Sequence, residues 1–256
     1  MNNLSQTVWV ELLKARRSKI PLLTALGISL IPLGGGFFLI VLKDPEMARQ
    51  MGLISAKAQI TMGAADWPTY LNFLYTAVAV GIIFFSFVVS WVFGREYSDR
   101  TVKDLLALPT SRSAIVFAKF VVIAVWSAGL TLLMALVGLC VGALVGLPPV
   151  PLQVTLQGGV TLAITACLTI LLVTPIAFFA SAGHGYLAPM AFALLVMGLS
   201  QFVGLAGWGE YFPWAIPTVY SQSGELGWVS IVIVILTSLV GLVATFAWWE
   251  LADQTH

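Results

Sequence analysis

The sequence predicts an all-α integral membrane protein with six transmembrane helices and both termini in the cytoplasm. Of its 256 residues, 59% are hydrophobic and only 9% are charged, whereas a soluble domain normally carries about 25% charged residues. Six apolar stretches are long enough to cross a bilayer, which takes about 20 residues in a helix. The basic residues lie mostly on one side of the resulting topology, as the positive-inside rule requires.

We expect one transmembrane domain over residues 1–256, because neither an internal repeat nor a low-complexity linker divides the chain. The net charge of +1 gives no indication of a nucleic-acid partner. The predicted spans are 20–42, 70–93, 114–147, 152–180, 187–206 and 227–249.

Residues 4–19 predict an amphipathic helix ahead of the first span. Leu4, Val8 and Leu12 recur at helical spacing and therefore share one face. The basic residues at its end are Lys14, Arg16, Arg17 and Lys19. Such a helix most simply lies in the membrane interface, with its basic end against the anionic inner leaflet. A basic flank that only orients the first span is the simpler alternative, and the two are compatible.

The first span contains residues that interrupt helices. Pro32 and the glycines at 34–36 predict a kink or an unwound turn in mid-membrane. Beyond the span, Asp44 and Pro45 resemble a helix cap followed by a first turn, so we expect an outer helix over 46–58.

Residues 93–113, between the second and third spans, are the densely charged part of the chain. The ionisable residues are Arg95, Glu96, Asp99, Arg100, Lys103, Asp104 and Arg112, and the i,i+4 pairs of opposite charge are Glu96/Arg100, Asp99/Lys103 and Arg100/Asp104. This spacing supports a short helix. We expect the helix to begin at Ser98 or Asp99 and to stop at Pro109.

The other face of this short helix is apolar. Val102, Leu105 and Leu106 form an i, i+3, i+4 stripe on a segment too short and too charged to enter the bilayer. The stripe either packs back on the protein's own spans or forms a docking surface for a water-soluble partner.

The same segment resembles the cytoplasmic loop of permease subunits in type-2 ABC exporters. The matching residues are Glu96, Arg100-Thr101, Leu105-Leu106, Pro109 and Ser111-Arg112, with Lys119 seven residues on. Many members of that family carry glycine where Arg100 stands. The resemblance implies a coupling helix that seats in a groove of a separate ATPase subunit. The residues to which it assigns this role are Glu96, Asp99, Arg100, Thr101, Val102, Leu105, Leu106, Pro109 and Arg112.

The resemblance also implies the rest of the assembly. Two permease subunits, identical or homologous, would combine with two ABC ATPase subunits in a bacterial plasma (inner) membrane, surrounded by membrane lipids. The ATPase would bind ATP and Mg²⁺, whereas this chain would bind no cofactor and would not be an enzyme. Permeases of this family commonly start with an interfacial elbow helix, which favours that interpretation of residues 4–19.

The third span begins near a helix cap at Ser111 or Ser113. Lys119, near its cytoplasmic end, can snorkel or pair with an acid of the preceding loop. Further along the span, three glycines at four-residue spacing permit close contact with another helix, either within the protomer or across a dimer. These glycines are Gly138, Gly142 and Gly146.

The second half of the chain carries few polar signals. A proline-rich turn at 148–151 precedes the fourth span, which we expect to bend near Pro175. His184 stands alone in the following turn, so a metal or catalytic role is not indicated. Aromatic residues in 207–226 predict a segment that follows the outer membrane interface. In the resembled family the corresponding segment forms short re-entrant helices.

The orientation follows from the basic residues. With the N-terminus inside, nine basic residues are cytoplasmic and three are outside. The three outside are Lys43, Arg49 and Lys57.

The motifs of several protein classes are absent from the sequence. It contains no Gly-Lys dipeptide and therefore no phosphate-binding loop of the G-x-x-x-x-G-K-[ST] type. Between Lys119 and Glu210 there is no Lys, Arg, Asp or Glu, whereas an ion-coupled carrier normally keeps an ionisable group at mid-membrane depth. The leading hypothesis is an ATP-driven export permease. An ion-coupled secondary transporter and a non-transporting membrane anchor or sensor remain as alternatives. Spans without charge suit an apolar or amphipathic cargo, such as a peptide antibiotic or a lipid.

Overall fold

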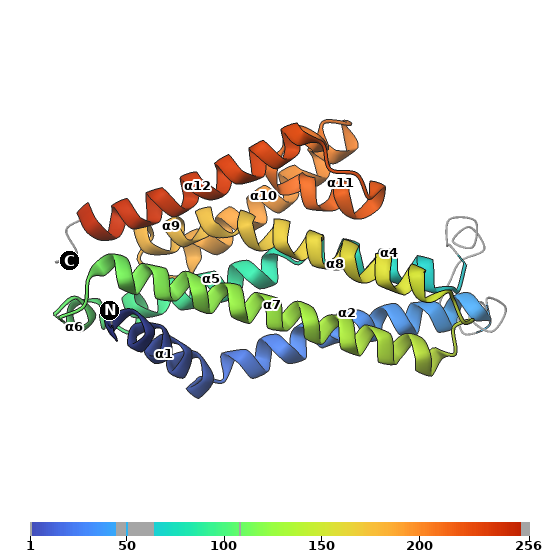
Figure 1. Ribbon diagram of the computed structural model, residues 1–256, viewed down its shortest axis with the longest axis horizontal. Helices are drawn as coiled ribbons and strands as arrows, with labels where there is room; N and C mark the ends of the chain where they lie inside the picture. Colours follow the sequence, from blue (N-terminus) through green and yellow to red (C-terminus); the bar gives the residue numbers. More distant parts are fainter. Residues whose placement is uncertain (1, 45–49, 51–63, 108, 252–256) are drawn as a thin grey trace.

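The computed structural model describes residues 2–44, 50, 64–107 and 109–251. Six helical stretches are long and apolar enough to cross a membrane, and they form one elongated bundle (Figure 1). The elements are α1 (Asn2–Arg17), α2 (Ile20–Lys43), α4 (Trp67–Val80), α5 (Ile82–Ser98), α6 (Val102–Leu106), α7 (Arg112–Val145), α8 (Leu152–Leu172), α9 (Thr174–Ala182), α10 (Leu187–Leu205), the 3₁₀ turns η2 (Gly209–Tyr211) and η3 (Pro213–Ala215), α11 (Ile216–Ser223) and α12 (Trp228–Leu251). The expected outer helix at 46–58 lies outside the described residues, apart from residue 50.

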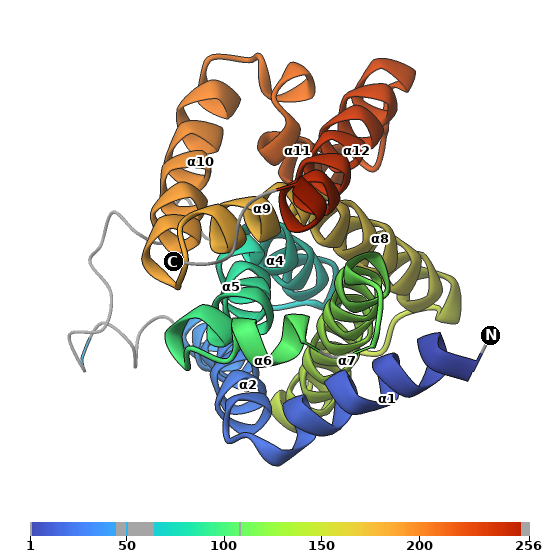
Figure 2. The same cartoon turned by 90° about the vertical axis from the view of Figure 1, so that its left-hand side faces the viewer.

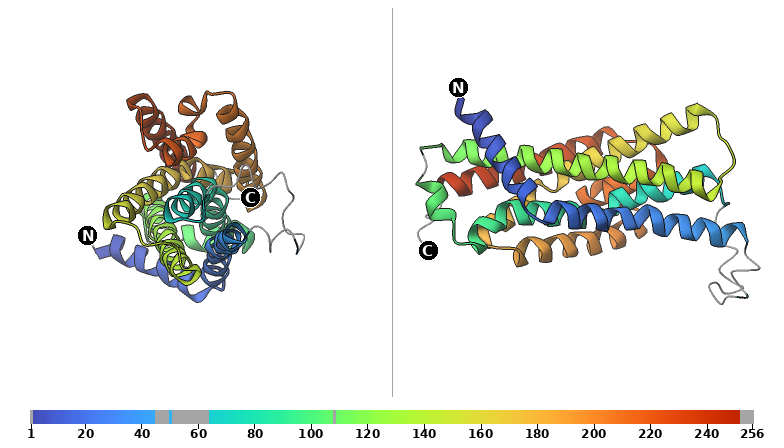
Figure 3. Two further views of the ribbon diagram at one scale, coloured as in Figure 1. Left: turned by 90° about the vertical axis from the view of Figure 1, so that its right-hand side faces the viewer. Right: turned by 90° about the horizontal axis from the view of Figure 1, so that it is seen from below.

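The two ends of the bundle differ. At one end, α1 crosses the spans at a steep angle and α6 lies across the bundle (Figures 2 and 3). Toward the other end, α11 packs against α4 and α8, and the indole N–H of Trp214 donates to the carbonyl of Leu172 at 3.1 Å. Residues 207–226 are therefore folded into short helices that pack on the spans.

The bend expected near Pro175 is present, because the fourth stretch consists of α8 and α9 with a break at Val173. Proline has no N–H, so it leaves the carbonyl of Leu171, four residues earlier, without its helical donor. The hydroxyls of Thr174 and Ser238 donate to that carbonyl at 2.9 and 3.0 Å. The second stretch is also divided, into α4 and α5, at Gly81, where no proline is present.

The unwound turn expected in the first span is not formed. Helix α2 runs without interruption through Pro32 and the three glycines that follow it. A Cβ on Gly35 would lie 2.5 Å from the ring of Phe73, and one on Gly36 would collide with Val141. These two glycines therefore allow α4 and α7 to approach α2 closely.

The short helix predicted in the charged segment is present as α6, which ends before Pro109, but the predicted start at Ser98 or Asp99 was wrong. Helix α5 continues to Ser98, and α6 is a separate single turn that starts after Thr101. Between them, Arg100 adopts a left-handed conformation with φ 57°. The three expected i,i+4 pairs are not formed, because they straddle this change of direction.

The end of α5 is a Schellman motif with Arg100 at the left-handed position. The amide of Thr101 donates to the carbonyl of Glu96 at 2.9 Å, and that of Arg100 donates to Tyr97 at 3.2 Å. Glycine is the residue that most readily occupies this position. At the start of α7, Ser111 accepts from the amide of Ala114, which confirms the cap predicted there.

Candidate functional site

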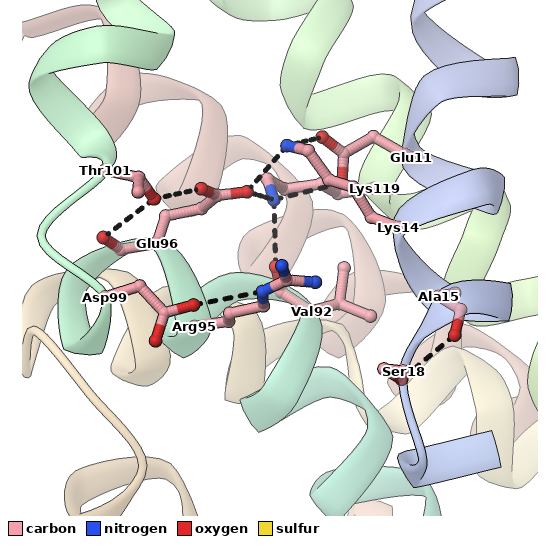
Figure 4. Close-up of polar contacts among 10 residues, drawn as sticks. All are labelled: Glu11, Lys14, Ala15, Ser18, Val92, Arg95, Glu96, Asp99, Thr101 and Lys119. Carbon is pink, nitrogen blue, oxygen red and sulfur yellow. Dashed lines mark hydrogen bonds and ion pairs between the residues drawn. The ribbon is translucent and has the colours of Figure 1, made fainter. Parts of the chain in front are cut away.

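Four charged side chains from three helices meet where α1 crosses the bundle. Glu11 and Lys14 come from α1, Glu96 comes from α5 and Lys119 comes from α7 (Figure 4). We call these four residues the charge cluster. Lys14 Nζ lies 2.7 Å from Glu11 Oε1 and 2.9 Å from Glu96 Oε1. Lys119 Nζ lies 3.2 Å from a carboxylate oxygen of each acid, so each cation contacts both acids.

The cluster is buried, and its charges are balanced. Lys119 has 0% of its surface exposed, Glu96 has 4% and Glu11 has 5%. Buried charges are tolerated only when they are paired and hydrogen-bonded. Lys119 fulfils this condition by using its remaining donor on the carbonyl of Val92, at 2.9 Å.

Lys14 is the most accessible member of the cluster and lies outside the membrane-spanning helices. Burial by itself would lower its pKa, but the neighbouring carboxylates of Glu11 and Glu96 outweigh that effect and raise the pKa above its usual value of 10.5. Lys14 therefore stays charged throughout the neutral range.

One hydrogen bond joins the cluster to α6. The hydroxyl of Thr101 donates to Glu96 Oε2 at 2.7 Å, and Thr101 is the residue from which α6 starts. Through Glu96, the orientation of α6 depends on α1, α5 and α7 together. The expected pairing of Lys119 with an acid of the preceding loop is confirmed for Glu96, whereas the role of Glu11 was not foreseen.

The two faces of α6 are unlike. Val102 is buried, and Leu105 is half-buried against the protein's own core. Lys103, Asp104 and Ala107 are exposed. Of the two interpretations of the apolar stripe, packing on the chain's own helices holds for Val102 and Leu105. The side chain of Leu106 is not among those described.

The remaining residues of the predicted coupling segment lie around this centre without joining it. Asp99 is exposed, and its carboxylate lies 3.1 Å from Arg95 Nε. Arg112 donates to the carbonyl of Trp249 at 3.0 Å, at the C-terminal end of α12, where a cation favours the helix dipole. Pro109 is exposed.

A family model described as "ABC-2 family transporter protein" matches residues 7–200, which include the charge cluster and α6. The chain belongs to the ABC-2 transporter family. It is 27% identical over 187 residues to the bacitracin transport permease protein BCRB of Bacillus licheniformis, covering 70% of this chain and 88% of that protein. This ABC-2 protein is therefore a membrane-embedded permease, the membrane subunit of an ABC transporter.

The glycine series of this ABC-2 permease faces a neighbouring helix of the same chain. A Cβ on Gly138 would lie 2.7 Å from Leu74 Cδ1, and one on Gly142 would lie 2.5 Å from the indole of Trp67, both on α4. Gly146 ends α7 with a φ of 69°. The first two glycines serve the contact between α4 and α7 within one protomer.

Proposed function

We propose that this permease is the membrane-spanning subunit of an ATP-driven exporter and that α6 contacts a separate ATPase subunit. The observation that supports this most directly is the bond between Thr101 and Glu96, which joins α6 to the buried charge cluster. Through Glu96, this bond connects α6 to α1, α5 and α7. A short helix that only joined two spans would need no such connection. The family and the relative in Bacillus licheniformis agree with a transport role.

In this proposal, hydrolysis takes place in the partner and movement takes place in this chain. The ATPase pair binds ATP and Mg²⁺ and displaces α6 when it closes. Because Glu96 is bonded to Thr101, Lys14 and Lys119, the displacement reaches α5, α7 and α1 as a rigid-body motion. The complete exporter contains two permeases and two ATPases in a bacterial plasma membrane, with α6 and both termini of this chain in the cytoplasm.

The face of α6 that meets the ATPase is polar. Lys103 and Asp104 are exposed there, while Val102 and Leu105 attach the helix to the bundle. Apolar or amphipathic molecules are the proposed cargo, because no Lys, Arg, Asp or Glu lies between Lys119 and Glu210. A peptide antibiotic is one such molecule, and the relative in Bacillus licheniformis is named a bacitracin transport permease.

Reversing the two exposed charges of α6 tests the contact. The double variant Lys103→Glu with Asp104→Lys should insert normally, because neither side chain packs in the bundle. It should lose co-purification with the ATPase and lose ATP-dependent transport. Glu225→Lys, in the segment that precedes α12, is the matched control and should change neither. If the double variant keeps both the partner and transport, α6 does not couple hydrolysis to movement.

The orientation is tested separately. In a chain without Cys140 and Cys167, a single cysteine at Glu225 should react with an impermeant thiol reagent added outside intact cells. A single cysteine at Lys103 should not react until the membrane is opened. Labelling of position 103 from outside would contradict both the topology and the ATPase contact.

A further inference from the structure

A polar cavity opens beside the charge cluster, between the end of α1, the end of α5 and the start of α10. Its volume is about 530 Å³, and Arg17, Arg95, Trp91, Ser18 and Tyr186 contribute to its lining. The guanidinium carbon of Arg95 lies 5.1 Å from the centre of the Trp91 ring. Figure 4 shows Arg95 among the polar groups at this end of the bundle, with Ser18 at the end of α1.

The balance of charge in this cavity favours an anion. Lys14, which also lines it, is neutralised by the two acids of the charge cluster. Arg95 pairs with Asp99, which is exposed and is the acidic residue of the lining. The positive charge of Arg17 is then in excess. The guanidinium groups of Arg17 and Arg95 suit a phosphate better than two ammonium groups would, because a guanidinium group can donate two parallel hydrogen bonds to it.

A second cavity, of about 310 Å³, is apolar. Leu23 of α2, Phe84 and Phe87 of α5 and Met190 of α10 contribute to its lining. It lies beside α2 and α5, and these two helices pack mainly on other helices and not on each other. Helix α2 packs on α7 and α4, and α5 packs on α9, α10 and α7. Phe87 is 39% exposed and Leu23 is 57% exposed, so the cavity faces the surroundings of the bundle.

The two cavities follow each other along α5 and α10, and along the chain where α1 leads into α2. The step from Ser18 to Leu23 is five residues, and the steps from Trp91 to Phe87 and from Tyr186 to Met190 are four residues each. At 1.5 Å per residue, the two four-residue steps place the apolar cavity about 6 Å deeper along α5 and α10 than the polar one. Both helices, and the start of α2, place the apolar cavity on the side of the polar one that leads into the membrane.

We propose that the two cavities together bind one anionic phospholipid. Its phosphate contacts Arg17 and Arg95, and one acyl chain lies over Phe84 and Phe87. Trp91 and Tyr186 stand at the junction, where aromatic side chains meet lipid headgroups. Inorganic phosphate would use the first cavity alone, and the aligned apolar cavity is what favours a lipid. The site does not depend on the proposed ATPase contact, so either proposal can fail without the other.

The headgroup contact is tested by lipid binding to the purified full-length chain in detergent. Phosphatidylglycerol and phosphatidylcholine with identical chains are titrated and counted by native mass spectrometry. Phosphatidylglycerol should bind more tightly, and Arg17→Gln and Arg95→Gln should each weaken it about fivefold, as expected for about 1 kcal/mol per basic residue at a lipid surface. Arg16→Gln is the matched control, because Arg16 is exposed and adjacent but does not line the cavity. Equal binding of the two lipids by the unmodified chain would overturn the proposal.

The acyl-chain contact is tested in the second cavity. Phe87→Ala should weaken both lipids, whereas Phe117→Ala should leave them unchanged, because Phe117 is 48% exposed on α7 and lies outside both cavities. Millimolar inorganic phosphate should not displace phosphatidylglycerol. If phosphate does displace it and Phe87→Ala has no effect, the site holds a free anion and the lipid is excluded. Arg95→Lys, which keeps the charge, should retain binding in part; complete loss in this variant would show that Arg95 acts on the fold instead.

Discussion

Glu96 is the residue that joins the most elements at the end of the bundle that we propose to be cytoplasmic. Its carboxylate accepts hydrogen bonds from Lys14, Lys119 and Thr101, and only 4% of its surface is exposed. Lys14 is on α1, Lys119 is on α7, and Thr101 is the residue from which α6 starts. Removing the carboxylate therefore leaves Lys119, which has no exposed surface, with one acid in place of two.

We expect Glu96→Gln to destabilise the isolated permease by about 3–5 kcal/mol, the usual cost of removing one partner of a buried ion pair. Thermal unfolding in detergent measures the effect. Asp99→Asn is the matched control and should cost less than about 1 kcal/mol, because Asp99 and its partner Arg95 are partly solvated. Adding Lys119→Met to Glu96→Gln should cost less than the two single changes added together. Additive costs would show that the two groups do not interact.

Arg100 provides a second test at the residue scale. A residue other than glycine is strained at φ 57°, so Arg100→Gly should stabilise the chain by up to about 1 kcal/mol. Lys103→Gly, inside α6, is the control and should destabilise it by a similar amount. If Arg100→Gly is destabilising, the arginine makes contacts that outweigh the strain of its backbone.

At the scale of elements, glycines determine how closely the helices approach. Gly35 and Gly36 allow α4 and α7 to pack on α2, and Gly138 and Gly142 allow α4 to pack on α7. Both groups of glycines were visible in the sequence, but sequence spacing does not state which helix a glycine faces. Of the kink or unwound turn predicted for α2, the unwound turn was wrong for that reason, since small residues in a span can serve packing instead.

Gly138→Leu should force Leu74 and α4 away from α7 and should lower stability by about 1–3 kcal/mol, as overpacking does. Gly129→Leu is its matched control on the same helix, because a Cβ there meets nothing within 4 Å. Thermal unfolding of the two variants side by side is the measurement. Equal midpoints would mean that α4 and α7 are not in close contact at Gly138.

At the scale of the whole molecule, the sequence predicted the six long apolar helices well and the charged end only in part. These helices follow from long apolar runs, which are local features, and their ends agree with the predicted bounds to within about five residues. The pairing of Lys119 with Glu96 could be foreseen because the two residues flank one loop. The pairing with Glu11 spans 108 positions, and no local pattern reports such a contact. Arg100 was misjudged because charge spacing favoured a helix at a position where the backbone reverses.

The carbonyl of Leu171 has a consequence for how the subunit can move. It accepts a hydrogen bond from the hydroxyl of Ser238 on α12. In return, the hydroxyl of Thr174 on α9 donates to the carbonyl of Ser238 at 3.0 Å. The backbone of Pro175 lies against Gly241 of α12. A ratchet of α12 past α9 by one turn would break both bonds and bring a larger residue against the proline. In the conformational change proposed for transport, these two helices should therefore move as one rigid body. A cross-link between cysteines at positions 174 and 238 should leave transport intact. Loss of transport on cross-linking would show that α9 and α12 slide past each other at this contact.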